Sequence, residues 1–301
     1  MNVLISGASG LIGSALAVVL TNAGHRALRL VRRAPATADE RQWDPDGGVL
    51  EESALDAVDA VVHLAGENIG GGRWTKRRMA RILESRQQGT RLIAEAMARA
   101  RQPPKVLISA SAIGYYGDRP GETLDEGSEP GEGFLADVCK EWEAACAPAR
   151  ERGLRVVNPR FGIVLSPAGG ALQRLLAPFK LGLGGRLGSG RQAMSWITLE
   201  DAVRVIRLAL EDATLAGPVN AVSPHPVTNR EFTKALGRVL RRPSSLPAPA
   251  FALRLALGKA AAPLLLTDQR VLPRVLQDHG FEFRHPELEP ALRVLLKKPS
   301  P

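Results

Sequence analysis

The chain has little cysteine, with only Cys139 and Cys146 among its 301 residues. Two thiols within one predicted helix cannot form the disulfide framework of a small secreted domain. No cluster of histidine and cysteine has metal-ligand spacing, so we expect no metal site. The low cysteine content fits a reducing, cytoplasmic compartment.

Long apolar runs are also missing. The longest, near residues 251–257 and 260–266, fall short of the ~18 residues that suggest a membrane span, and Lys259 separates them. The N-terminus starts with the strand-like Asn2-Val3-Leu4-Ile5 and lacks the charged-then-apolar layout of a signal peptide. We therefore expect no association with a membrane.

Aromatic residues make up only 4% of the chain, whereas its formal net charge is +9. A basic protein can bind nucleic acid. Here the arginines are scattered, apart from a dense stretch over residues 73–86, and few aromatic side chains could stack on bases. We expect no nucleic-acid partner, since a phosphorylated small molecule is a simpler anionic ligand.

Strand-like and helix-like segments alternate over the first 160 residues. Strands are predicted at residues 2–6, 26–31, 57–65, 105–109 and 154–165, and helices at 11–23, 76–101 and 135–152. The second strand alternates apolar and basic residues, as an outer strand would. This pattern predicts βαβ units and a doubly wound parallel α/β sheet of the Rossmann type. A ligand crevice is then expected at the carboxyl ends of the strands.

The pattern changes after Leu165. A glycine-rich, loop-like stretch is followed by a helix at 199–211, a strand at 219–222 and a helix at 229–240. Pro243, Pro247 and Pro249 mark a linker, and two further helical pieces end with residues 287–296. We predict one domain over residues 1–165, to which 196–222 return, and a smaller domain over 166–301.

A glycine motif lies between the first strand and the first helix, the position that a dinucleotide-binding loop requires. Its glycines allow a tight turn, a close approach of the backbone to a pyrophosphate, and close packing of helix on strand. The helix N-terminus adds free N–H groups and partial positive charge. The residues predicted to bind here are Gly7, Ser9, Gly10, Leu11, Ile12 and Gly13.

The end of the second strand favours NADP(H) over NAD(H). An NAD enzyme usually has an acidic residue there for the ribose 2′-hydroxyl. This strand ends Leu30-Val31-Arg32-Arg33, and no acid follows before Asp39. A guanidinium can pair with a 2′-phosphate through two hydrogen bonds. We therefore expect residues 1–165 to bind NADP(H) and residues 166–301 to bind substrate.

Several motifs together resemble the extended and atypical short-chain dehydrogenases/reductases, and more narrowly their "epimerase family protein" group. The resemblance covers nearly the whole chain. It is carried by Gly7–Gly13, Leu64-Ala65-Gly66-Glu67-Asn68, Trp74, Glu84-Ser85-Arg86, Tyr115-Tyr116-Gly117, Trp142-Glu143, the glycines from Gly182 to Gly190, Trp196-Ile197, Asp201 and Pro286-Glu287-Leu288.

The resemblance implies an NADP-binding Rossmann domain, a C-terminal domain of unknown role and an oxidoreductase or epimerase activity on an unestablished substrate. It also implies further residues that line the dinucleotide. These are Val31, Arg32, Leu64, Ala65, Arg86 and Val164, with Arg81 as a weaker candidate. Gly66 ends a predicted central strand with Leu64 and Ala65, where small residues can lie against adenosine and ribose. Arg86 can alternatively fix the loop that carries Glu67.

The catalytic pair of such enzymes is absent. They usually use Tyr-x-x-x-Lys on a helix, where the tyrosine transfers a proton while hydride moves. In this chain Leu135 and Cys139 occupy the two places, and Lys140 is rotated away from the second. Either another residue acts as the general acid, or the chain catalyses no reaction.

Elimination leaves one segment for an alternative acid. His25, His63, His225, His279 and His285 lie in strands, turns or late segments outside the expected crevice. The strand at 105–109 ends at the rim of this crevice, where short-chain enzymes place a serine that binds the substrate carbonyl. We therefore predict Ser111, Tyr115 and Tyr116 as catalytic residues. Phe179, Arg186, Gln192, Met194 and Trp196 are further pocket candidates.

Two classes of function remain. The first is an NADP-dependent oxidoreductase or epimerase that acts on a small carbonyl or hydroxyl compound. The second is a non-catalytic NADP(H)-binding sensor or scaffold, which the missing pair favours. Labels on some family members suggest a link to cell division, for which these residues give no support. The expected partner is a small-molecule substrate, and a homodimer is left open.

Overall fold

The computed structural model describes residues 1–247 and 266–297. The apolar runs near 251–257 and 260–266 therefore lie almost wholly outside the described residues. Within these residues, no helix is long and apolar enough to cross a membrane. No group of three or more His, Cys, Asp or Glu side chains in the same part of the chain could hold a metal ion.

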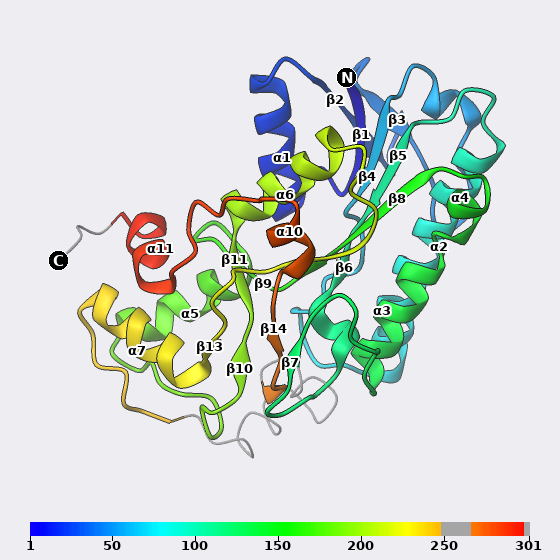
Figure 1. Ribbon diagram of the computed structural model, residues 1–301. Coiled ribbons are helices and arrows are strands. Elements are labelled where there is room, and N and C mark those ends of the chain that lie inside the picture. Colours follow the sequence, from blue (N-terminus) through cyan, green and yellow to red (C-terminus); the bar gives the residue numbers. More distant parts are fainter. Residues whose placement is uncertain (248–265, 298–301) are drawn as a thin grey trace.

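A parallel sheet of eight strands forms the larger lobe (Figure 1). Its spatial order is β12-β8-β5-β4-β1-β2-β3, and the short β6 pairs with β8. The strands are β1 (Asn2–Ser6), β2 (Arg26–Val31), β3 (Glu40–Gln42), β4 (Ala60–His63), β5 (Val106–Ser109), β6 (Ser111–Ala112), β8 (Arg155–Phe161) and β12 (Gly217–Ala221). The predicted doubly wound fold is confirmed. The edge strand β3 was not predicted, and it lies outside β2.

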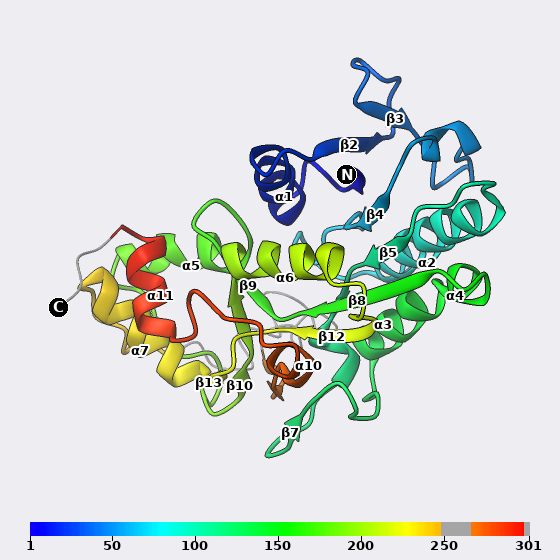
Figure 2. The ribbon, with the colours of Figure 1, turned by 45° about the horizontal axis from the view of Figure 1, so that its top comes forward.

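Helices cover both faces of this sheet. On one side lie α1 (Leu11–Asn22) and α6 (Leu199–Glu211), and on the other α2 (Lys76–Arg99), α3 (Phe134–Ala144) and α4 (Ala147–Glu151) (Figure 2). Successive side chains of a strand point to opposite faces. Val3 and Ile5 accordingly pack with α1 and α6, whereas Leu4 packs with Ile93 and Met97 of α2. The short 3-10 helices η1 (Glu52–Leu55) and η2 (Ile113–Tyr116) lie in the connections.

One helix that was predicted to be continuous is two helices in the structure. Residues 135–152 were expected to be continuous, but α3 ends at Ala144 and α4 starts at Ala147. The cause is Pro148, which has no N–H and whose ring would clash with the carbonyl four residues earlier, at Ala144. Both cysteines lie in this region as buried free thiols.

The smaller lobe packs three helices around its own apolar core. These are α5 (Gly170–Lys180), α7 (Asn229–Leu240) and α11 (Leu288–Leu295). Short strand pairs support it: β9 (Ile163–Leu165) with β11 (Trp196–Thr198), β10 (Ala193–Met194) with β13 (Val227–Thr228), and β14 (Arg270–Val271) with β7 (Thr123–Leu124). The short α10 (Arg274–Asp278) contacts β12.

Helix α5 lies where the sequence suggested only loop. Its buried Leu172, Leu176 and Phe179 follow helical spacing and line the lobe core. Phe179 and Trp196 are therefore core residues rather than pocket residues, because neither has more than 3% of its surface exposed.

The chain passes between the lobes at Gly162. A Cβ atom there would lie 2.6 Å from the Ser195 carbonyl oxygen and 2.8 Å from a methyl group of Val222, so only glycine fits. Within residues 196–222, β12 pairs with β8 of the large sheet and α6 covers one of its faces, whereas β11 pairs with β9.

Candidate dinucleotide site and catalytic segment

The loop between β1 and α1 is shaped by two glycines. Gly7 has φ +70°, a conformation that side chains disfavour. A Cβ atom on Gly7 would lie 2.8 Å from the Ala65 nitrogen and 2.8 Å from the Leu64 carbonyl carbon. A Cβ atom on Gly13 would overlap the Gly7 carbonyl oxygen. Tight packing of helix, turn and neighbouring strand thus requires both glycines.

The first turn of α1 has no side chain that accepts hydrogen bonds from its free backbone N–H groups. Its N-cap is Gly10, which makes no side-chain cap, and the first turn contains no acidic residue. Ser9 and Gly10 are exposed, and Leu11 and Ile12 start the helix with N–H groups that lack intrahelical partners. This geometry fits the phosphate oxygens of a dinucleotide, which such an end binds through N–H groups and the helix dipole.

The two arginines after β2 have different roles. Arg33 donates to both carboxylate oxygens of Glu40, at 2.8 and 2.6 Å. The hydrogen bond from Arg33 lowers the pKa of Glu40 to about 2. Arg32 follows the partly buried Val31, is exposed, and makes no hydrogen bond or ion pair with any described residue. Of these two arginines, Arg32 is therefore the one left available to an anionic ligand.

A buried pair fixes the segment after β4. The amides of Leu64 and Ala65 donate to the Ser6 hydroxyl, at 3.2 and 3.3 Å, and this hydroxyl lies 2.6 Å from His63 Nδ1. Burial lowers the pKa of His63 to about 3, so the ring is neutral. Leu64 and Ala65 are consequently held beside Gly7, as the predicted site requires.

The smaller lobe also reaches the phosphate loop. A Cβ atom on Gly169 would lie 3.1 Å from Leu11 Cδ1, and one on Gly170 would lie 3.4 Å from the Val164 carbonyl oxygen. Val164 of β9 and Leu11 of α1 thus both lie near the start of α5. The fold brings these two predicted residues close together although they are far apart in the chain.

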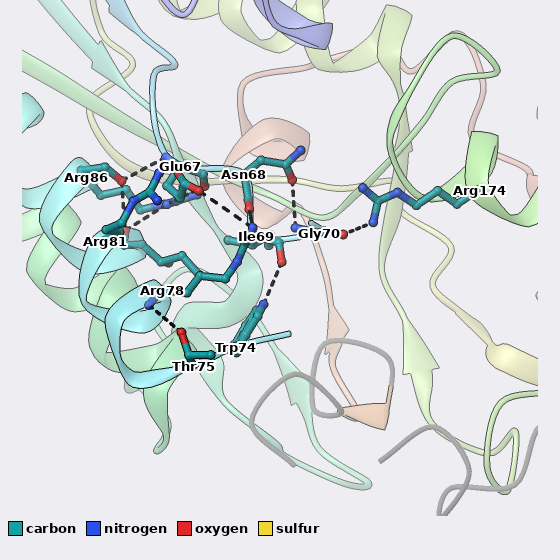
Figure 3. Close-up of polar contacts among 12 residues, drawn as sticks. Glu67, Asn68, Ile69, Gly70, Trp74, Thr75, Arg78, Arg81, Arg86 and Arg174 are labelled. Carbon is teal, nitrogen blue, oxygen red and sulfur yellow. Dashed lines mark hydrogen bonds and ion pairs between the residues drawn. The ribbon is translucent and has the colours of Figure 1, made fainter. Parts of the chain in front are cut away.

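Arginines of α2 hold the loop that follows Gly66 (Figure 3). Arg86 Nη1 donates to the carbonyl oxygens of Glu67 and Ile82, at 3.1 and 3.0 Å. Arg81 pairs with the Glu67 carboxylate at 2.9 Å. The alternative role predicted for Arg86, fixing the loop that carries Glu67, is present, and Arg81 acts on the same residue.

The same loop also contacts the smaller lobe. Arg78 donates to the Asn68 carbonyl oxygen, and Arg174 of α5 donates to the Gly70 carbonyl oxygen (Figure 3). Trp74 Nε1 donates to the Ile69 carbonyl oxygen at 2.9 Å. Residues 67–74 therefore connect α2 with α5 across the two lobes.

The predicted catalytic residues converge on a buried charge pair. Arg160 of β8 and Glu143 of α3 form two hydrogen bonds of 2.8 Å. Ser111 donates to Glu143 at 2.6 Å. The Tyr116 hydroxyl accepts from Arg160 at 2.9 Å and donates to Asn220 at 2.7 Å. Sequence reasoning gave Arg160, Glu143 and Asn220 no role, because they lie on three separate elements.

Of the three predicted catalytic residues, Tyr115 alone is more than 2% exposed. Ser111 is 2% and Tyr116 0% exposed, and burial raises the pKa of Tyr116 to about 12. The Arg160 guanidinium carbon lies 3.5 Å from the centre of the Tyr115 ring. Ser111 and Tyr116 are thus held within the network, and Tyr115 is the phenol that is partly exposed.

The positions of the usual catalytic pair lie on α3, as expected. Cys139 is buried, which raises the pKa of its thiol to about 12. Lys140 instead forms an ion pair with Asp137 at 2.7 Å. Leu135 packs with Trp74 and Ile82 in a small apolar cluster. Neither place therefore offers a titratable proton donor or a cation at neutral pH.

The model of the NAD dependent epimerase/dehydratase family matches residues 3–222. The chain belongs to this family. A domain of unknown function (DUF1731) matches residues 248–295. The predicted family resemblance is thereby confirmed.

Relatives in the family match over nearly the whole chain. Epimerase family protein Mb2239 of Mycobacterium bovis is 48% identical, with 99% of this chain and 98% of the relative covered. The crystal structure of human epimerase family protein SDR39U1 with NADPH has a TM-score of 0.91 at 35% identity, and the match covers 99% of each chain. A nucleoside-diphosphate sugar epimerase from Corynebacterium glutamicum has a TM-score of 0.81 at 37% identity, covering 98% of this chain and 58% of that one.

Proposed function

We propose that this chain is an NADP(H)-dependent oxidoreductase or epimerase that acts on a small carbonyl or hydroxyl compound. The observation that carries the proposal is the exposed, unpaired Arg32 at the end of β2, on the same sheet edge as a glycine loop that fits a pyrophosphate. The crystal structure of the human relative contains NADPH, which supports the same ligand here.

Different residues of the chain would bind different parts of the dinucleotide. The N–H groups at Leu11 and Ile12 would hold the pyrophosphate, and Arg32 would pair with the 2′-phosphate. Leu64 and Ala65 would line the site beside Gly7. When bound, the nicotinamide supplies or accepts a hydride.

Proton transfer is proposed for the Tyr115 hydroxyl. Tyr115 is the most exposed of the three predicted catalytic residues. The Arg160 guanidinium, which is paired with Glu143, lies over its ring and holds it in place. Ser111 and Tyr116 would position this segment through Glu143 and Arg160 rather than touch the substrate. Residues 166–301 are proposed to supply the substrate side of the site.

The test is oxidation of NADPH by the full chain against a panel of aldehydes and ketones, together with analysis of the products formed from nucleotide sugars, because an epimerase makes no net change to the cofactor. With any substrate that turns over, Tyr115→Phe should reduce kcat by about 10²–10⁴-fold, the usual effect of losing a general acid, with NADPH affinity unchanged. Full activity in this variant would exclude Tyr115 as the acid.

A binding-only role is the second candidate, and Leu135 and Cys139 at the usual catalytic places favour it. NADPH binding without turnover of any panel member would support a sensor or scaffold. In either case we propose a reducing, cytoplasmic compartment, because both cysteines are free, buried thiols.

A further inference from the structure

Basic side chains gather around a cavity at the C-terminal end of α7. The cavity has a volume of about 350 Å³ and is lined mainly by four cations, a glycine and a serine: Lys234, Gly237, Arg238, Arg241, Arg242 and Ser244. Helix α7 belongs to the smaller lobe and lies apart from the large sheet (Figure 1). The cavity shares no lining residue with the dinucleotide site.

The positive charge around this cavity is poorly compensated. Arg238 donates through Nε and Nη2 to one oxygen of Glu289, at 2.9 and 2.6 Å. The side chains of Lys234, Arg241 and Arg242 make no hydrogen bond or ion pair with any described residue. Lys234 and Arg238 are four residues apart on one helix, a spacing at which like charges destabilise the helix.

The carboxylate one turn before Lys234 does not relieve this charge. Glu231 is the N3 residue of α7, and its Oε2 accepts hydrogen bonds from the Thr228 amide and hydroxyl, at 2.7 and 2.8 Å. This capping box holds the carboxylate at the opposite end of the helix from the cavity. An anion bound in the cavity would therefore supply charge that the described residues leave out.

The backbone at Arg241 is unusual for an arginine. This residue is the C-cap of α7 and has φ +53° and ψ +46°, the left-handed conformation. Helices often end in this conformation, but glycine is the residue that adopts it without steric cost. A helix C-terminus attracts cations, but Arg238 in the last turn already meets that preference. Arg241 thus keeps a second cation at the cavity at the cost of a strained backbone.

A glycine lets the following residues fold back onto the helix. A Cβ atom on Gly237 would lie 2.7 Å from the Ser244 hydroxyl oxygen and 3.1 Å from the Arg242 carbonyl oxygen. The Arg242 amide donates to the Gly237 carbonyl oxygen at 3.0 Å, which closes the turn. The Ser244 hydroxyl makes no hydrogen bond with any described residue. The turn therefore brings a further unpartnered donor into the wall of the cavity.

These groups suit the oxygens of a phosphate. Guanidinium and ammonium groups carry only donors, and they bind phosphate through charge-assisted hydrogen bonds, to which a hydroxyl adds one more. Several cations around one cavity favour a doubly charged phosphate over a singly charged carboxylate. The volume lies at the lower end of the range for small-molecule sites, about 300–1,000 Å³. A small compound that carries a phosphate group therefore matches both the charge and the size.

We propose that this cavity binds the phosphate group of a small organic phosphate. Lys234, Arg241 and Arg242 supply the charge, and the Ser244 hydroxyl donates a further hydrogen bond. Arg238, held by Glu289, forms part of the wall. The inference does not rest on the proposed function, because the cavity lies outside the dinucleotide site.

The experiment titrates two probes, inorganic phosphate and glycerol 3-phosphate, into the full chain by calorimetry. The chain is first saturated with NADPH, so that the phosphate loop is occupied. Both probes should bind at one site. Arg241→Gly should weaken both probes about tenfold or more, the usual effect of losing a charged hydrogen bond. It should not lower the melting temperature, because glycine suits the left-handed backbone. Arg242→Gln should weaken both probes to a similar extent.

A matched control separates this site from general attraction by a basic protein. Arg207→Gln removes an equal charge from the exposed face of α6, where Arg207 pairs with Glu211 at 2.8 Å, and should change the affinity for neither probe. Equal weakening of the probes by Arg207→Gln and Arg241→Gly would show that the net charge of the chain, not the cavity, attracts phosphate.

The remaining outcomes are distinct. Absence of binding, or unchanged affinity in both Arg241→Gly and Arg242→Gln, would overturn the site. Binding of inorganic phosphate without binding of glycerol 3-phosphate would overturn its assignment to an organic phosphate. If the unmodified chain does not bind NADPH, the proposed cofactor is wrong. The same titrations on Gly10→Asp, whose new carboxylate repels anions from the phosphate loop, then test the cavity with the same outcomes.

Discussion

The substitution Glu143→Gln tests the buried charge pair beneath the predicted catalytic segment. The side chains of Glu143 and Arg160 are 13% and 3% exposed, so water can replace little of the lost interaction. Glutamine keeps the shape and one acceptor oxygen, but it removes the charge and turns an amide donor toward the guanidinium. The Glu143 carboxylate raises the pKa of Arg160 despite the opposing effect of burial, so the arginine stays charged. Removing one partner of a buried pair typically destabilises a protein by about 3–5 kcal/mol.

Urea unfolding followed by tryptophan fluorescence and by far-UV circular dichroism measures this loss, and coincident transitions check that one equilibrium is observed. Glu95→Gln is the matched control, because it breaks the exposed pair with Arg91 and should cost less than about 1 kcal/mol. Adding Arg160→Met to Glu143→Gln should restore part of the stability, since the uncompensated charge is then gone. If Glu143→Gln costs no more than Glu95→Gln, the pair does not hold this segment as described.

Three further predictions follow from the sites. Arg32→Ala should weaken NADPH about ten- to a hundredfold and leave NADH nearly unchanged, measured by calorimetry, because only NADPH carries the 2′-phosphate; equal weakening would make Arg32 structural. In Tyr115→Phe, the one remaining phenol is Tyr116, and absorbance titration should find its pKa near 12. Since an unfolded tyrosine ionises near 10, Tyr116 should stabilise the fold below that pH, and this contribution should be lost as pH rises from about 10 to about 12; ionisation near 10 in the folded variant would contradict its burial. Gly13→Ala should lower the melting temperature and NADPH affinity together, because its methyl group would overlap the Gly7 carbonyl oxygen; a stable, binding variant would show that the loop can shift.

Local sequence signals predicted most of the larger lobe and helix α7 of the smaller one. Helix α6 and helix α7 have the predicted bounds, because apolar spacing and the N-cap threonines Thr198 and Thr228 act within a few residues. Helix α5 was missed because its N-cap Gly169 and its first residue Gly170 in isolation predict a loop. The break before α4 follows from Pro148, a signal that was present in the sequence.

The site was less predictable where its contacts are long-range. Whether Arg32 or Arg33 is available depends on Glu40, which lies in the unpredicted strand β3 and takes Arg33. Likewise, the buried Tyr116 hydroxyl is satisfied because it donates a hydrogen bond to Asn220, which lies 104 residues later in the chain. No local pattern encodes these pairings, since they arise only when the sheet assembles.

Dinucleotide binding by this chain depends most directly on the loop Gly7–Gly13. Calorimetric titration of NADPH into the full chain and into Gly10→Asp tests it. The new carboxylate would face the open end of α1, where Gly10 has only the Gly7 carbonyl oxygen near its Cβ position, so the fold should tolerate it. We predict that the unmodified chain binds NADPH and that folded Gly10→Asp does not, because the carboxylate repels the pyrophosphate. Unchanged NADPH affinity in Gly10→Asp, or no binding to the unmodified chain, would contradict dinucleotide binding at this loop.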